Sequence, residues 1–148
     1  MKNVPTIEPY QDADRAEALG LFDANAPAFF HPGERGVFER FLTERASIYR
    51  LVHRGSVIAG AFGLGDEGLG RGRIVWFMAD PSHHGQGLGR LMIEAIRREA
   101  EERGVSTIDI SASHISEDFY AYFGAKTLSR TDHGWGEGMH RVDMIWEI

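Results

Sequence analysis

A glycine-rich turn between a strand-like run and a helix-like run constrains the fold of this chain most. The turn reads Pro-Ser-His-His-Gly-Gln-Gly-Leu-Gly over residues 81–89. The run before it, residues 74–79, is apolar, and the run after it, residues 88–103, carries apolar residues at helical spacing. A turn of this kind presents free backbone N–H groups at the positive end of a helix dipole. The pattern therefore predicts a binding site for a phosphorylated ligand.

The helix over residues 88–103 is predicted from a single apolar stripe. The stripe recurs at i, i+3, i+4, i+7 and i+8 and consists of Leu88, Leu91, Met92, Ala95 and Ile96. Gly104 follows as the C-terminal stop signal. Such a helix packs its stripe on a sheet and leaves its N-terminus free to bind a ligand.

The remaining elements follow from hydrophobic periodicity and from punctuating glycine and proline. Helices are predicted from Asp12 or Asp14 to about residue 24, over about 34–46 and over about 117–123. Strands are predicted over 6–9, 48–53, 57–64, 71–79, 105–111, 126–130 and 140–147, with a glycine-rich loop over 131–139. This order predicts antiparallel meanders that flank one parallel strand–helix–strand crossover, and not a doubly wound sheet.

Composition narrows the class of protein. A chain of 148 residues with 43% apolar and 26% charged residues predicts one domain over 1–148. No run approaches the roughly 18 apolar residues of a membrane span, and Met1–Pro5 lacks the apolar core of a secretory signal. The absence of cysteine excludes disulfides and thiolate catalysis and fits a cytoplasmic location. A net charge of −6 argues against nucleic acid as a partner, and the histidine spacing predicts no metal site.

Three kinds of phosphorylated ligand bind at a glycine-rich turn before a helix. A P-loop requires Gly-x-x-x-x-Gly-Lys-Ser/Thr, and Leu88-Gly89-Arg90-Leu91 breaks that pattern. A dinucleotide-binding turn requires Gly-x-Gly-x-x-Gly early in a βαβ unit. Here the glycines are spaced i, i+2, i+4 at 85, 87 and 89, after several predicted strands. Coenzyme A is the remaining candidate.

The same residues resemble the GNAT superfamily of acyl-CoA-dependent N-acyltransferases. The family's phosphate signature, Gln/Arg-x-x-Gly-x-Gly/Ala, is matched over 84–89 at both glycines, with His84 in place of Gln or Arg. Phe119-Tyr120-x-x-x-Gly124 follows at the expected distance, and the order of elements matches over nearly the whole chain. The resemblance implies an α/β (α+β) fold: a mixed, mostly antiparallel sheet with a central parallel β-α-β cofactor unit and helices on both faces.

The resemblance also implies acetyl-CoA as the cofactor. It assigns the pyrophosphate to backbone N–H groups of the turn and the pantetheine arm to the end of the preceding strand. An N–H of Met78 or Ala79 would stabilise negative charge on the thioester oxygen. The cofactor-binding residues are therefore expected to be Phe77, Met78, Ala79, His84, Gly85, Gln86, Gly87, Leu88, Gly89 and Arg90.

The resemblance places the general acid at Tyr120, four residues before Gly124. The base stays open, because an alkylamine with a pKa of about 10 must lose a proton before it attacks. Asp109 lies on a polar face of the strand over 105–111; it acts as a base if burial raises its pKa, and otherwise hydrogen-bonds the backbone. His114, Glu67 and ordered water are the other candidates.

The acceptor is expected to be a primary amine of a small molecule or peptide. Phe29, Phe30, His31 and Trp76 are predicted to wall its pocket. Trp135, in the glycine-rich loop, either belongs to a mobile lid or packs on the sheet. The alternative functions are a non-catalytic acyl-CoA-binding or regulatory module on the same fold and a nucleotide-binding domain. A homodimer paired through the strand over 140–148 is a further candidate.

Overall fold

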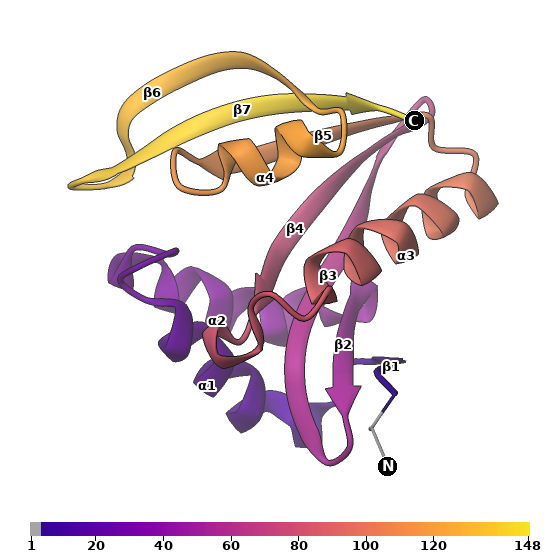
Figure 1. Cartoon of the computed structure of the whole chain (residues 1–148), viewed down its shortest axis with the longest axis vertical. Helices are drawn as coiled ribbons and strands as arrows, with labels where there is room; N and C mark the ends of the chain where they lie inside the picture. Colours follow the sequence, from indigo (N-terminus) through magenta and orange to yellow (C-terminus); the bar gives the residue numbers. More distant parts are fainter. Residues whose placement is uncertain (1–3) are drawn as a thin grey trace.

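The computed structural model describes residues 4–148, which form a seven-stranded sheet with helices on both of its faces (Figure 1). The strands are β1 (Thr6–Pro9), β2 (Tyr49–Arg54), β3 (Val57–Gly68), β4 (Arg71–Ala79), β5 (Thr107–Ser113), β6 (Lys126–Gly136) and β7 (Met139–Glu147). The helices are α1 (Arg15–Asn25), α2 (Arg35–Glu44), α3 (Leu88–Glu102) and α4 (Glu117–Tyr122). Short 3₁₀ turns lie between them: η1 (Asp12–Asp14), η2 (Pro32–Glu34), η3 (Ala46–Ile48) and η4 (Pro81–His83).

The sheet order β1-β2-β3-β4-β5-β7-β6 confirms the predicted mixed topology. Within residues 4–148, β4 and β5 form the one parallel pair, joined through α3, and all other neighbours are antiparallel. The parallel pairing runs only from Arg71 to Ile74 of β4, against residues 107–110 of β5. The two strands separate beyond Ile74, so the second half of β4 has no partner on that side.

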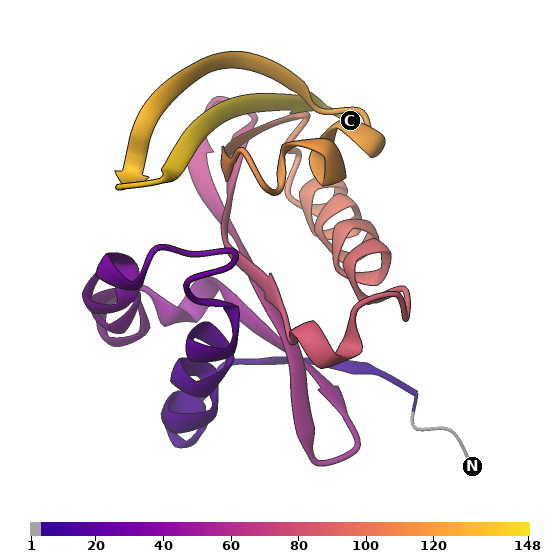
Figure 2. The same cartoon turned by 60° about the vertical axis from the view of Figure 1, so that its left-hand side comes forward.

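Helices cover the two faces of the sheet in pairs. Figure 2 shows α1 and α2 on one side and α3 and α4 on the other. The predicted stripe of α3 supplies Leu88, Met92 and Ile96 to the core on its side, each no more than 2% exposed. Burying a side chain of this size contributes about 1.5–3 kcal/mol. This packing holds the N-terminus of α3 beside the open half of β4.

The prediction of a glycine-rich loop over residues 131–139 is wrong, because most of this segment is strand. β6 continues to Gly136 and β7 begins at Met139, so a tight turn joins the two strands. The pairing register shifts between Thr131 and Gly136, and this irregularity accommodates the extra residues without ending the strand. The result is a long curved hairpin that reaches toward α1 and α2 (Figure 2).

Two further expectations differ from the structure. The strand predicted over 105–111 occupies 107–113, because Val105 first bonds back to Ala100 to close the end of α3. The strand over 140–148 cannot pair across a dimer through its backbone, since β7 lies between β5 and β6.

No helix among the described residues is both long and apolar enough to cross a bilayer. The expectations for Met1–Pro5 and for a domain starting at residue 1 lie partly outside the described residues.

Candidate active site

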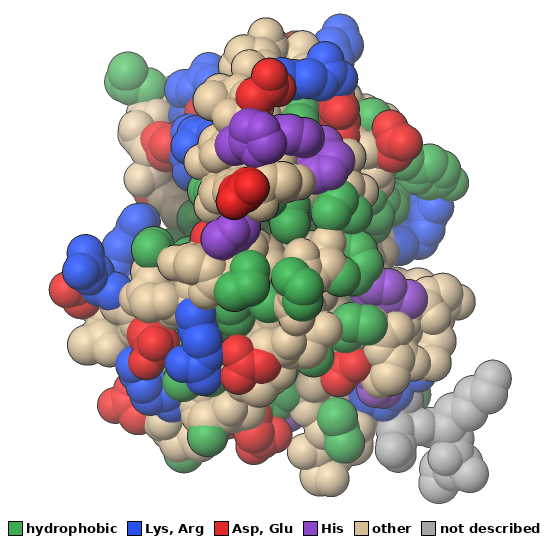
Figure 3. All heavy atoms as spheres, turned by 90° about the vertical axis from the view of Figure 1, so that its left-hand side faces the viewer, with side chains coloured by type: hydrophobic (Ala, Val, Ile, Leu, Met, Phe, Trp, Pro, Cys, Tyr) green, Lys and Arg blue, Asp and Glu red, His purple; other side chains and the backbone are tan. Residues whose placement is uncertain are grey.

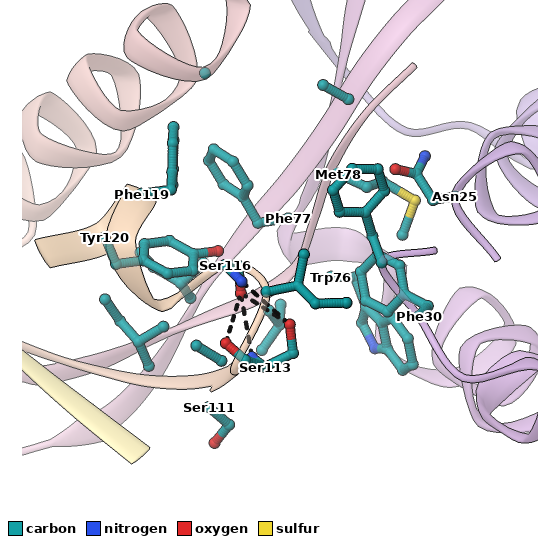
Figure 4. A pocket seen from close by; sticks show the side chains of 18 of the residues that line it. Asn25, Phe30, Trp76, Phe77, Met78, Ser111, Ser113, Ser116, Phe119 and Tyr120 are labelled. Carbon is teal, nitrogen blue, oxygen red and sulfur yellow. Dashed lines mark hydrogen bonds between the residues drawn. The ribbon is translucent and has the colours of Figure 1, made fainter. Parts of the chain in front are cut away.

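A cavity of about 500 Å³ opens where β4 and β5 separate. One end lies at the turn before α3, and the other lies at the segment between α1 and α2. The ends of β4 and β5, together with α4, form the walls between them. Figure 4 shows Phe119 and Tyr120 on one side of this cavity and Asn25, Phe30 and Trp76 on the other.

The turn before α3 leaves a row of backbone donors free. In the described chain, no intramolecular hydrogen bond involves the N–H groups of residues 85–90. The first helical bond is donated by Leu91 N–H to the carbonyl of Gly87, at 3.0 Å. Six consecutive unpaired donors at the positive end of a 15-residue helix form a strong site for an anion.

The three glycines of this turn have two different roles. Gly85 and Gly87 have φ angles of 80° and 79°, which side chains rarely adopt, and a Cβ at either position would meet no atom within 4 Å. A Cβ at Gly89 would instead lie 2.7 Å from Phe119. The first two glycines therefore shape the turn and keep its outer surface open, whereas the third allows α3 and α4 to pack closely.

Side chains near the turn are arranged differently from the expectation. Arg90, expected among the cofactor-binding residues, donates to the Tyr122 hydroxyl at 3.1 Å and lies over the Phe123 ring. Arg54, in the β2–β3 hairpin, bonds the Gln86 side chain at 2.7 Å and keeps a buried Nε without a partner. His83, which lines the cavity, also has a buried nitrogen without a partner, Nδ1.

Arg54 and His83 are therefore the charged or titratable groups nearest the free N–H row that sequence reasoning missed. His83 lies directly before the phosphate signature over residues 84–89, and this adjacency was a signal by which it could have been found. Arg54 lies 32 residues before Gln86 and becomes a neighbour only through the tertiary fold. Arg54 Nε is a donor, and His83 Nδ1 is one when it carries the ring proton, so unpartnered nitrogens near a row of free N–H groups fit a diphosphate, which presents several acceptor oxygens.

The open edge of β4 provides the next part of the cavity. Phe77, Met78 and Ala79 all line it, as expected for the strand that precedes the turn. The Asp80 N–H donates to Ala59 of β3 at 2.8 Å. Because backbone donors alternate sides along a strand, the Ala79 N–H faces away from β3 and toward the opening, while the Met78 N–H faces β3.

Trp76 turns out of β4 at a bulge. Its φ of 46° accompanies a register shift between β3 and β4, and its carbonyl accepts a 2.7 Å hydrogen bond from the Tyr49 hydroxyl. The ring lies 4.9 Å from Phe38 and 5.9 Å from Phe30. Trp76 thus joins the aromatic cluster at the far end of the cavity, where it had been expected.

Tyr120 points its hydroxyl toward the middle of the cavity (Figure 4). Its ring is buried against Phe77 and Phe119, at centroid distances of 5.8 and 5.2 Å. Burial raises the pKa of Tyr120, so the phenol keeps its proton. Beside it, Ser113 and Ser116 are joined by hydrogen bonds of 3.1–3.3 Å, a polar pair that sequence reasoning missed.

Asp109 is not in the cavity, and its pKa is lowered and not raised, so the condition for a role as base is not met; its partner is a side chain and not the backbone. Two bonds of 2.6 and 3.3 Å join its carboxylate to the Arg71 guanidinium. Burial works to raise the pKa of Asp109, but the side chains of Glu67, Arg71 and Arg73 together lower it. Glu67 is paired in turn with Arg73 at 3.0 Å and also lies outside the cavity. Parallel pairing of β4 with β5 causes this, because it places Arg71 and Arg73 beside the polar face of β5.

Two expected histidines also lie outside the cavity wall. His114 accepts a hydrogen bond from His140 N–H at 3.2 Å, and its ring packs 4.7 Å from that of His140. His133 packs on the other side of His140 at 4.9 Å, and histidines gather on this part of the surface in Figure 3. His31 accepts from Gly33 N–H, and its ring lies directly over Gly136 of the β6–β7 hairpin.

The far end of the cavity is aromatic. Phe30 lines it, and Phe29, whose ring lies 5.3 Å from that of His84, joins it to the turn before α3. The N–H groups of Phe29 and Phe30 are fixed to the carbonyl of Asn25 at 2.7 and 3.1 Å. Trp135 lines it as well and donates from its indole to the Ala112 carbonyl at 2.8 Å. In the structure Trp135 packs on β5, as the second of its two predicted alternatives describes. Glu34, which sequence reasoning missed, completes this end.

Comparisons with known proteins agree with this architecture. A family model described as an acetyltransferase (GNAT) domain matches residues 24–148. The fold is similar to the ribosomal-protein-S18-alanine N-acetyltransferase from Escherichia coli, with a TM-score of 0.81, 18% identity and coverage of 98% of this chain and 94% of that one. A search of curated proteins finds no match.

Two more solved structures share the fold. Ard1 from Thermoplasma volcanium has a TM-score of 0.82 and 12% identity, covering 97% of each chain. The N-acetylglutamate synthase from Neisseria gonorrhoeae, complexed with coenzyme A and N-acetyl-glutamate, has a TM-score of 0.77 and 14% identity. That match covers 99% of this chain and 36% of the synthase. Identities this low establish a common fold.

Proposed function

Because this chain belongs to the GNAT acetyltransferase family, we propose that it transfers the acetyl group of acetyl-CoA to a primary amine of a small molecule or peptide. The amine would attack directly, within a ternary complex of enzyme, acetyl-CoA and acceptor. The observation that carries the proposal is a single cavity that runs from the free N–H row at residues 85–90 to the aromatic end at Phe30.

The turn before α3 would hold the diphosphate of acetyl-CoA. Backbone N–H groups of residues 85–90 would donate to its oxygens, and His83 and Arg54 would supply additional donors. The open edge of β4 would hold the pantetheine arm, because its unpaired backbone groups can bond an extended ligand. When bound, acetyl-CoA supplies the thioester carbonyl that accepts the amine.

Two groups of the chain then act at the reacting end. The Ala79 N–H faces the opening and would donate to the carbonyl oxygen, where negative charge develops. Tyr120 holds its proton at Oη inside the cavity, the state that a proton donor to the departing sulfur requires. Asp109 and His114 are not assigned a role, because neither lines the cavity.

The proposal is tested by incubating the protein with acetyl-CoA and pooled amines, amino acids and peptides. We expect release of free thiol together with a mass increase of one acetyl group on at least one amine. Binding of coenzyme A without thiol release on any amine would instead support a non-catalytic acyl-CoA-binding module. Displacement of coenzyme A by ATP or NAD would support the nucleotide-binding alternative.

A further inference from the structure

One carboxylate lines the cavity among the described residues, that of Glu34. It ends η2 at the start of α2, in the aromatic end of the cavity with Phe29 and Phe30. The other side chains of the wall that can carry charge are basic: Arg73, His83 and His84. Glu34 is thus the single acid in a wall that is otherwise apolar, uncharged polar or basic.

The neighbouring arginines are already paired with other acids. Arg73 binds Glu67 at 3.0 Å and donates to Ser111 at 2.6 Å, and Arg35 binds Asp23 at 2.8 Å. Over residues 4–148, no ion pair includes Glu34. The negative charge of this carboxylate is therefore available to a ligand in the cavity.

Only one oxygen of Glu34 is used within the protein. Oε2 accepts a hydrogen bond from His31 N–H at 2.9 Å, and this bond caps the first turn of η2. Burial raises the pKa of Glu34, although the bond from His31 partly opposes the rise. A carboxylate with a raised pKa accepts a proton more readily than an exposed one.

Resting on the proposed function, we infer that the carboxylate of Glu34 binds the ammonium group of the acceptor and removes its proton. An alkylammonium ion has a pKa of about 10 and no lone pair, so it must lose a proton before it can form the C–N bond. The aromatic walls and the single acid together select a primary ammonium carried on a compact apolar or aromatic skeleton.

The protons balance in this step. One ammonium proton passes to Glu34 and from there to solvent. The nitrogen lone pair then forms the C–N bond as the C=O electron pair moves onto oxygen. That pair returns as the C–S bond breaks, and the sulfur takes a proton from Tyr120. A second ammonium proton leaves the nitrogen as the amide forms and restores Tyr120, and the third stays on the amide nitrogen.

Glu34→Gln separates this role from the structural one. Glutamine keeps an acceptor oxygen for His31 N–H, so the cap of η2 is retained while the charge is lost. Glu39→Gln is the matched control, because Glu39 is another carboxylate of this region but lies outside the cavity wall. Thermal unfolding checks that both variants fold.

The decisive measurement is calorimetric binding of 2-phenylethylammonium and of neutral 2-phenylethanol to the coenzyme A-loaded protein. We expect Glu34→Gln to weaken ammonium binding at least tenfold, to leave alcohol binding unchanged, and Glu39→Gln to match the wild type. Equal ammonium binding by Glu34→Gln and wild type overturns the inference. A wild type that binds the ammonium no more tightly than the alcohol also overturns it.

Thiol release tests the proton transfer with 2-phenylethylamine and its 2,2-difluoro analogue, which has nearly the same shape but a much less basic amine. Glu34→Gln is expected to slow the more basic amine at least tenfold more than the fluorinated one. Equal slowing of both overturns proton removal by Glu34. The proposed function fails by a different result: wild-type protein that binds these ligands but releases no thiol with any amine.

Discussion

The two ends of the cavity are built from different kinds of groups. At the proposed cofactor end, the donors are six consecutive backbone N–H groups, and their positions follow from the conformation of one turn. At the acceptor end, side chains are brought together from Asn25 through Trp135, on three separate segments. A substitution that changes the backbone conformation should therefore abolish binding at the cofactor end. A substitution of one side chain at the acceptor end should instead weaken binding only by the contribution of that side chain.

The largest effect is expected from Gly87→Val. Valine disfavours a φ of 79° and projects methyl groups into the open space where the diphosphate would lie. Losing even two hydrogen bonds to a charged group, at about 1.5 kcal/mol or more each, corresponds to roughly a 100-fold loss of affinity. Calorimetric titration with coenzyme A measures the change.

Gly138→Val is the matched control for this variant. Gly138 has a φ of 80° and equally open surroundings, but it lies in the β6–β7 turn and not at the cofactor end. It should suffer the same backbone strain and keep its affinity for coenzyme A. Tight coenzyme A binding by a folded Gly87→Val protein would contradict the assigned phosphate site.

Tyr120→Phe should produce the next largest effect, and on turnover alone. General acids contribute about 10²- to 10⁴-fold to rate, so we expect kcat to fall roughly 100-fold. The phenyl ring keeps its contacts with Phe77 and Phe119, so affinity for coenzyme A should hold within about twofold. Steady-state kinetics and calorimetry give the two numbers. Parallel losses in both would mean that Tyr120 is a packing residue.

At the acceptor end, Trp135→Ala should give a graded loss. Removing the indole takes away one wall of the cavity and its hydrogen bond to Ala112. Lost apolar contact of about 1.5 kcal/mol corresponds to roughly a tenfold higher KM for the amine, with KM for acetyl-CoA unchanged. Trp135→Phe retains an aromatic wall and should lie between the two. An equal rise in both KM values would show that the hairpin supports the whole cavity.

The contrast between the cofactor end and the acceptor end also explains which features could be predicted from the sequence. The helix stripe from Leu88 to Ile96 and the glycine spacing are local, and the features that they predict, a buried helix face and an open turn, are present in the structure. Tyr120 is expected near the departing sulfur through the family resemblance, and Trp76 is expected in the wall of the acceptor pocket; both line the cavity. Features that depend on the local backbone conformation can therefore be predicted from a short run of residues.

The acceptor end was less predictable because it depends on tertiary neighbours. His31 lies on Gly136 outside the cavity wall, while Glu34, three residues later, lines it. No local pattern separates the two. Arg54 likewise reaches Gln86 only because the β2–β3 hairpin folds beside the turn. Residues such as these are found only after the elements have been placed in space.

Asp109→Asn should have the smallest effect, because it changes a carboxylate that lies outside the acceptor end of the cavity. Asp109 pairs with Arg71 outside the cavity, so kcat/KM should stay within about twofold of wild type, and a tenfold loss would reinstate this carboxylate as a base.

The free energy of unfolding of the Asp109→Asn protein at pH 7 should be lower than that of wild type by about 0.5–1 kcal/mol, as for other partly exposed ion pairs. The folded pKa of Asp109 is lowered, so its stabilisation is complete above the unfolded pKa of about 3.9. That contribution is lost as the pH falls through the folded pKa, and urea unfolding of the two proteins should therefore converge in acid.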